Sequence, residues 1–93
     1  MQFLSISHRR DGVTESDCAG LVKQEIYRAR VLYSEGFIRQ VWHRADKPGA
    51  CLLWEADREE QVREMLDTLP FAQAGLVNIV VIPLKPWAGF GPA

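Results

Sequence analysis

The stretch FIRQVWHRADKPGACLLWEAD, residues 37–57, contains the clearest indication of the fold in this chain. Phe37 to Arg44 and Ala50 to Ala56 are rich in the β-branched and aromatic residues that favour strands. The four residues Asp46-Lys47-Pro48-Gly49 have turn chemistry, since proline restricts φ and glycine accepts a positive φ. We therefore predict a β-hairpin at the centre of the chain.

A helix is predicted before this hairpin. The segment Thr14-Glu15-Ser16-Asp17 offers N-cap residues, and its acidic side chains suit the positive end of a helix dipole. Gly36 stands where a C-terminal cap glycine belongs. The pattern predicts one continuous helix from this segment to about Glu35.

A second helix is predicted after the hairpin. Asp57 and Glu60 have the spacing of a capping box, and Pro70 is expected to end the helix. Its apolar stripe has i, i+3, i+4, i+7 spacing. The stripe consists of Val62, Met65, Leu66 and Leu69.

Strands complete both ends, one from Met1 to His8 and one from Leu76 to Leu84. The resulting order, βαββαβ, is the split βαβ pattern. We therefore expect an α+β, ferredoxin-like domain over residues 1–86, with a four-stranded antiparallel sheet and two helices on one face. Residues 87–93 form an irregular C-terminal tail, whose Trp87 and Phe90 we expect to anchor it on this subunit or on a partner.

The last strand is apolar at successive positions, so both of its faces are apolar. Two helices cover one face of a four-stranded sheet, and the second face needs another cover. We expect a second copy in a C2 homodimer to cover it. The less favoured alternative is that the tail folds back over the sheet.

Composition excludes several classes of function. The chain has 93 residues, is 47% hydrophobic and 25% charged, and has a net charge of −1, so no nucleic-acid partner is expected. No apolar run is long enough for a membrane span, and we expect a cytoplasmic protein. Cys18 and Cys51 suit reduced thiols, and neither they nor His8 and His43 have metal-site spacing.

One carboxylate conflicts with its surroundings. On a helical wheel Glu25 falls within the apolar arc of the first helix, formed by Cys18, Leu21, Val22, Ile26, Ala29, Leu32 and Tyr33. Burial raises the pKa of an unpaired carboxyl, which suits a general base that removes a proton next to a carbonyl. An internal salt bridge to Arg39 or Arg44 is an equally weighted alternative.

Several short passages resemble the muconolactone isomerase family. Residues Tyr33 to Arg44 resemble its passage REG-x-x-R-x-x-W-R, and Leu53 to Asp57 resemble its strand V-F-D-V-x. Met65 to Phe71 resemble L-L-x-x-L-P-L, and Val80 to Leu84 resemble the end of I-E-V-T-P-L. The similarity is colinear over about residues 18 to 86.

The resemblance implies a dimeric α/β barrel, assembled into homodimers and often into larger rings such as decamers. It implies cofactor-free isomerisation of a five-membered unsaturated lactone during breakdown of aromatic compounds. Glu25 matches the glutamate of the family passage K-A-x-E, and Arg39 and Trp42 also match family positions. This chain departs from the family pattern at four positions, Leu4, Gln40, Pro48 and Ala50.

We therefore expect an isomerase acting on a small anionic carbonyl or lactone compound. In it, Glu25 moves the proton, and Arg39 holds a carboxylate or stabilises an enolate. Trp42 and Trp54 wall the pocket, and the hydroxyl of Tyr33 reaches it. Two alternatives stand beside this interpretation: a catalytically silent ligand-binding or assembly module, and a cofactor-free monooxygenase of the dimeric α/β-barrel type.

Overall fold

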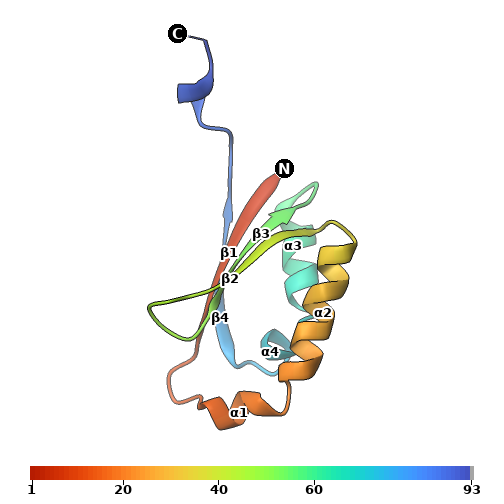
Figure 1. Ribbon diagram of the computed structural model, residues 1–93, viewed down its shortest axis with the longest axis vertical. Coiled ribbons are helices and arrows are strands. Elements are labelled where there is room, and N and C mark those ends of the chain that lie inside the picture. The colour runs from red at the N-terminus through yellow and green to blue at the C-terminus, as the bar shows by residue number, and fades with distance from the viewer. Residues whose placement is uncertain (93) are drawn as a thin grey trace.

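The computed structural model describes residues 1–92 and shows one sheet with helices packed on one side (Figure 1). The elements, in chain order, are β1 (Gln2–Arg9), α1 (Glu15–Ala19), α2 (Val22–Ser34), β2 (Ile38–His43), β3 (Ala50–Glu55), α3 (Glu59–Leu66), α4 (Pro70–Gln73), β4 (Val77–Pro83) and the single 3₁₀ turn η1 (Ala88–Phe90). The predicted α+β, ferredoxin-like arrangement is confirmed.

The sheet has the strand order β2-β3-β1-β4, and every neighbouring pair is antiparallel. The predicted hairpin is β2 and β3, so β2 lies at one edge and β4 at the other. The register of β2 shifts between Ile38 and Gln40, which leaves Arg39 at an irregularity. All residues of β2 after Ile38 are exposed, and the strand lies beside α2 (Figure 1).

The core lies between the sheet and the helices. The four residues of the predicted stripe are all buried; three of them lie on α3, whereas the helix ends at Leu66 and Leu69 is the N-cap of α4. The buried apolar residues that pack with this stripe, from the strands, α2 and the residue after β3, are Phe3, Leu32, Ile38, Leu52, Trp54, Ala56 and Val81. Inside this core the indole Nε1–H of Trp54 donates a 2.8 Å hydrogen bond to Oγ of Ser5.

The prediction of one continuous first helix is wrong. Helix α1 ends at Ala19 and α2 begins at Val22, so α1 lies across the end of α2 (Figure 1). Gly20 lies at this junction, where its low helix propensity weakens continuation. Thr14 is confirmed as an N-cap, with a capping box to Asp17. Gly36 has a φ of 86° after the end of α2, as a C-terminal cap glycine requires.

The predicted capping box of the second helix is also wrong. Helix α3 begins at Glu59 with Arg58 as its N-cap, so Asp57 lies one residue too early to cap it. The backbone N–H of Asp57 instead donates to Oε1 of Gln61 at 3.0 Å. Pro70 begins α4 in place of ending α3, because the first turn of a helix needs no N–H from that residue.

Gly49 is required for a different reason from the one predicted. The glycines with positive φ in residues 1–92 are Gly12, Gly36 and Gly75, so the predicted positive φ at Gly49 is wrong. A Cβ at Gly49 would overlap the carbonyl oxygen of Ser7 on β1. The hairpin turn therefore needs glycine for its close approach to the neighbouring strand.

The C-terminal tail extends away from the sheet (Figure 1). Trp87 and Phe90 are 68% and 89% exposed and pack edge to face on each other, with ring centroids 4.6 Å apart. The alternative that the tail covers the open face of its own sheet is therefore wrong for the described residues. Ala93, the last residue of the predicted tail, lies outside the residues that the structure describes.

Candidate functional site

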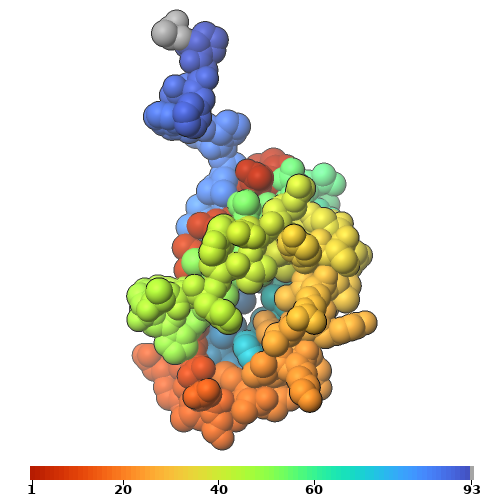
Figure 2. Space-filling view, in the orientation of Figure 1, coloured from red at the N-terminus to blue at the C-terminus, as the bar shows by residue number. Residues whose placement is uncertain are grey.

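A cavity of about 500 Å³ lies between the helix-covered face of the sheet and helices α2 and α4. Figure 2 shows the hollow between β2 and α2, with α4 and β4 visible at its depth. Most of its lining is apolar. The strands and the hairpin turn contribute Ser5, Ser7, Arg9, Val41, His43, Pro48, Gly49, Ala50, Leu52, Val77 and Ile79, and the helical side contributes Cys18, Glu25, Ile26, Ala29, Arg30, Tyr33, Leu66, Leu69, Phe71 and Ala72.

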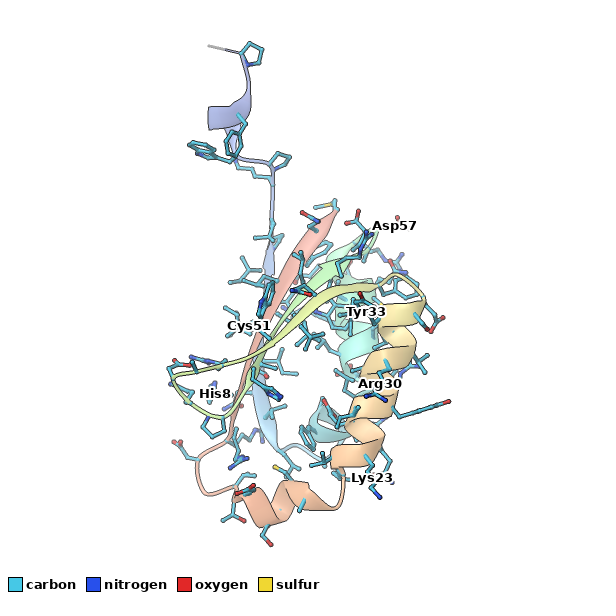
Figure 3. The ribbon with its side chains drawn as sticks, viewed as in Figure 1. His8, Lys23, Arg30, Tyr33, Cys51 and Asp57 are labelled. Carbon is cyan, nitrogen blue, oxygen red and sulfur yellow. The ribbon has the colours of Figure 1, made fainter. Side chains whose placement is uncertain are left out.

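Five of the lining residues lie on α2, and their spacing explains the shape of the cavity. At roughly 100° per residue the arc runs in the order Glu25, Ala29, Tyr33, Ile26, Arg30. Glu25 lies at the edge of this arc that meets α4, and it is half-buried. Arg30 lies at the opposite, exposed edge, and Figure 3 shows it with Tyr33 on the same helix. The cavity therefore has a deep end at Glu25 and a mouth at Arg30.

The carboxylate of Glu25 is held by one backbone group. The N–H of Phe71, the second residue of α4, donates a 2.9 Å hydrogen bond to Oε1 of Glu25. Burial raises the pKa of Glu25 above its ordinary value, and this hydrogen bond opposes the rise. The second carboxylate oxygen makes no hydrogen bond to any described residue. Glu25 is thus a partly desolvated carboxyl group with one oxygen available to a ligand.

The alternative of an internal salt bridge at Glu25 is wrong. In the part of the chain described, Glu25 takes part in no ion pair. Arg44 instead forms a bidentate pair with Asp46, with Nη2–Oδ2 and Nε–Oδ1 distances of 2.7 and 3.0 Å. Arg39 is exposed and does not line the cavity. No cation from residues 1–92 therefore compensates the desolvation of Glu25.

The structure separates the residues that we expected to surround the pocket. Tyr33 lies at the mouth and is 59% exposed. Trp54 is fully buried behind the cavity wall, whereas Trp42 is 47% exposed on the opposite face of the sheet. The expectation that both tryptophans and Arg39 contact the cavity is wrong within one chain. Trp54 pairs with Ile38 and Trp42 pairs with Cys51, and alternate residues along a strand point to opposite faces.

Sequence reasoning missed four groups that reach this cavity: the side chains of Arg9, Arg30 and His43 and the backbone N–H of Phe71. Strand alternation was a usable signal for two of them, because Arg9 shares a face with Phe3 and His43 shares a face with Val41. No local sequence pattern predicted the contact of the Phe71 N–H with Glu25, because it joins segments that are 46 residues apart.

The face of the sheet that bears no helix is apolar and partly exposed. It carries two adjacent cross-strand rows, Trp42-Cys51-Ile6-Val80 and Gln40-Leu53-Leu4-Ile82. Val80 is 59% exposed and Ile82 is 38% exposed, while Ile79 and Val81 face the helices. The predicted apolar character of both faces of the last strand is therefore present in the structure.

Residues 1–92 contain neither a cluster of metal ligands nor a membrane-spanning helix. No three His, Cys, Asp or Glu side chains of this segment gather as a metal site would require. Cys18 and Cys51 are both free thiols. None of the described helices has the length and apolarity needed to cross a membrane.

The sequence model of the muconolactone delta-isomerase family matches residues 1–88. The chain belongs to this family. The match spans every strand and every helix α1 to α4, so it covers all walls of the cavity. A search of curated proteins found no match. Family membership thus rests on the whole domain and is independent of any single motif.

Solved structures support the fold of this muconolactone isomerase family member. A 5-chloro-2-hydroxyhydroquinone dehydrochlorinase from Burkholderia phenoliruptrix AC1100, solved with 2,5-dihydroxybenzoquinone, is 20% identical with a TM-score of 0.79, over 96% of this chain and 98% of that chain. A muconolactone isomerase is 19% identical with a TM-score of 0.78, over 100% and 97% of the two chains. A NIPSNAP domain protein from Burkholderia xenovorans is 17% identical with a TM-score of 0.51, over 100% of both chains.

Proposed function

We propose that this muconolactone isomerase family member is a cofactor-free isomerase. It shifts a double bond in a small unsaturated lactone, or in a related carbonyl ring compound, by proton transfer through Glu25. The observation that carries the proposal is the desolvated Glu25 carboxyl group, which faces an apolar cavity and pairs with no cation of residues 1–92. A carboxyl group with a raised pKa exchanges a carbon-bound proton more readily near neutral pH.

The proposed reaction needs no redox partner. The free oxygen of Glu25 removes a proton from a saturated ring carbon next to the conjugated C=C–C=O system, and the C–H electron pair becomes part of a dienolate. The carbonyl oxygen carries the resulting negative charge. Glu25, now protonated, returns the proton to another carbon of the conjugated system, and the double bond is displaced with no net change in atoms or electrons.

The contact from Phe71 suits this cycle. A backbone N–H can donate to Oε1 of Glu25 whether the other oxygen is ionised or protonated, so the side chain stays in place in both states. Because Phe71 occupies one oxygen, the other is the one that exchanges protons with a ligand. Holding a base in one orientation contributes to the rate by positioning it against the reacting carbon.

The cavity suits a small ring. Its volume of about 500 Å³ is within the usual range for a small-molecule site, and its lining is mainly apolar. The similar dehydrochlorinase was solved with 2,5-dihydroxybenzoquinone, a ring with conjugated carbonyl groups. A compound of this class, formed during breakdown of aromatic molecules, fits the substrate that we propose here.

We also propose that the protein forms a homodimer through the open face of its sheet, and that dimers can assemble into larger rings. The two apolar rows on this face remain partly exposed in the single chain, and a second copy would bury them. In this arrangement the extended tail, with Trp87 and Phe90, is free to reach the cavity of another subunit. Removal of residues 87–93 tests this role, because intact assembly and activity would exclude it.

Proton exchange into muconolactone, followed by NMR in D₂O, tests the chemical proposal without assuming the direction of isomerisation. We expect Glu25→Gln to slow exchange by at least about 100-fold, the lower end of typical general acid–base contributions. Glu64→Gln, an exposed change on α3, is the matched control. Unchanged exchange in Glu25→Gln would refute the role of Glu25. Saturable binding without exchange in the unmodified protein would favour a silent ligand-binding module.

A further inference from the structure

The charges around the cavity are unequal. Three basic side chains, Arg9, Arg30 and His43, line it, and Glu25 is the single acidic residue of the lining within residues 1–92. The whole chain has a net charge of −1, so this local excess of basic groups does not follow from overall composition. A cavity with such a lining favours an anionic ligand.

The mouth is the part of the cavity suited to that anion. Arg30 lies on α2 and His43 on β2, the two elements that border the hollow in Figure 2. Both side chains are exposed, and neither makes an ion pair with a described residue. Their N–H groups therefore remain available to a ligand from two different walls.

Arg9 is less suited to this role. It is only partly exposed, and it lies close enough to Asp17 of α1 to affect that carboxyl group. The hydrogen bonds from Thr14 lower the pKa of Asp17, and the charge of Arg9 lowers it further. Neither Arg9 nor Arg30 forms an ion pair with a residue of 1–92, so the lower exposure of Arg9 and its nearby carboxylate are what distinguish it from Arg30.

We propose that Arg30, assisted by His43, is the anion anchor of this cavity and selects ring compounds that carry a carboxylate or ionised hydroxyl on the end away from Glu25. This assignment rests on the proposed function, since it names the substrate class of the same site. It replaces Arg39, which lies outside the cavity.

The helix geometry sets the length of the ligand. Arg30 lies about 7.5 Å along α2 and about 140° around it from Glu25, by standard α-helical dimensions. A ring above Glu25 with a short acidic arm would span this separation. The guanidinium can bind a carboxylate through two parallel N–H groups, which fixes the orientation of the ring as well as its charge.

Binding of a matched pair of ligands tests the anchor. The probes are muconolactone, which carries one carboxylate, and its neutral methyl ester, titrated by calorimetry into the Glu25→Gln protein so that no turnover occurs. We expect the added Arg30→Gln change to weaken carboxylate binding about tenfold, as for loss of a charge-assisted hydrogen bond, and to leave ester binding unchanged. Arg30→Lys should give an intermediate loss.

Lys23→Gln is the matched control, because Lys23 is exposed on the same helix, carries the same charge and does not line the cavity (Figure 3). It should leave the affinity for both probes within about twofold. The anchor is overturned if the Glu25→Gln protein shows no preference for the carboxylate, or if Arg30→Gln weakens both probes equally.

The two proposals fail in different ways. Full proton exchange by Glu25→Gln would refute the proposed function, while a carboxylate-specific loss in Arg30→Gln would still support the anchor. Equal binding of both probes would remove the anchor and leave the role of Glu25 to the exchange experiment.

Discussion

The backbone N–H of Phe71 donates a 2.9 Å hydrogen bond to Oε1 of Glu25, and this contact joins the first turn of α4 to the cavity side of α2. It combines two opposing effects on one carboxyl group. Burial disfavours the charged form and raises the pKa, whereas the hydrogen bond lowers it, and burial is the larger effect. Glu25 is therefore held in place without becoming a strong acid.

Stability should depend on pH through Glu25. Because its folded-state pKa lies above the ordinary value of 4.5, the folded chain binds the proton more tightly than the unfolded chain. The free energy of unfolding should then fall as pH rises from the unfolded pKa through the folded one. Glu25→Gln should remove this fall, as measured by urea unfolding over about pH 4 to 8. Parallel stability curves for the two proteins would contradict the expectation.

Activity should also depend on the ionisation of Glu25. The base form of Glu25 is the one that removes a proton, so kcat/KM should rise with pH through the raised pKa and then level. The pH–rate profile of lactone exchange measures this midpoint directly. A midpoint below 4.5, the ordinary value for a glutamate, would be inconsistent with burial as the dominant effect.

The buried Trp54–Ser5 hydrogen bond should stabilise the core. Ser5→Ala leaves the indole N–H of Trp54 without its 2.8 Å partner in a fully buried position, which should cost about 1–3 kcal/mol. Urea unfolding followed by tryptophan fluorescence measures this loss. Ser16→Ala, at an exposed position in α1, is the control and should stay within about 0.5 kcal/mol. A loss of the same size in both variants would show that the hydrogen bond has no special role.

The two glycines Gly49 and Gly20 should respond in opposite directions to alanine. Gly49→Ala places a Cβ against the backbone of Ser7, so we expect a loss of about 1–3 kcal/mol from forced displacement of the hairpin. Gly20 has a φ of −71°, and a Cβ added there would meet no neighbouring atom within 4 Å. Gly20→Ala should therefore be neutral or stabilising by up to about 1 kcal/mol. Thermal unfolding of both variants distinguishes the two effects, and equal losses would contradict them.

The open face of the sheet should control self-association. Trp42→Asp introduces a charge into its apolar rows and should weaken the proposed dimer by at least about 30-fold, the effect of losing a central interface residue. Sedimentation velocity over a range of protein concentrations measures this change. Tyr27→Asp, 71% exposed on α2 and outside the cavity lining, is the control. Identical sedimentation of Trp42→Asp and the unmodified chain would exclude this face as the interface.

Local patterns predicted the elements well but their junctions poorly. Periodicity identified the buried stripe of α3, and cap chemistry located Thr14 and Gly36 correctly. The break at Gly20 depends on where α1 and α2 pack, which no cap residue specifies. Likewise Asp57 and Glu60 had the right spacing for a capping box, but the helix begins one residue later than that motif requires, with Arg58 as its N-cap.

In the candidate site, too, local patterns predicted one feature correctly and failed where packing and strand pairing decide. The helical wheel of α2 was sufficient to single out Glu25, because a carboxylate on an apolar arc is visible in a local window. Trp54 lies on the helix-covered face but is fully buried in the core, behind the residues that line the cavity. Trp42 was misplaced because the face it occupies depends on the pairing register, and the irregularity between Ile38 and Gln40 changes that register inside β2. A shift by one residue exchanges the two faces of a strand.

Residue chemistry and periodicity within short segments were enough to specify the order of the four strands and of the two helical segments between them, the family, and the position of Glu25 on an apolar helix face. The surroundings of that carboxylate came from the packing of distant elements. They are the N–H of Phe71, the absence of a salt bridge among the described residues, and the basic side chains of Arg30 and His43 at the mouth. The physical reason is distance along the chain, since these contacts form only when separate elements pack against one sheet.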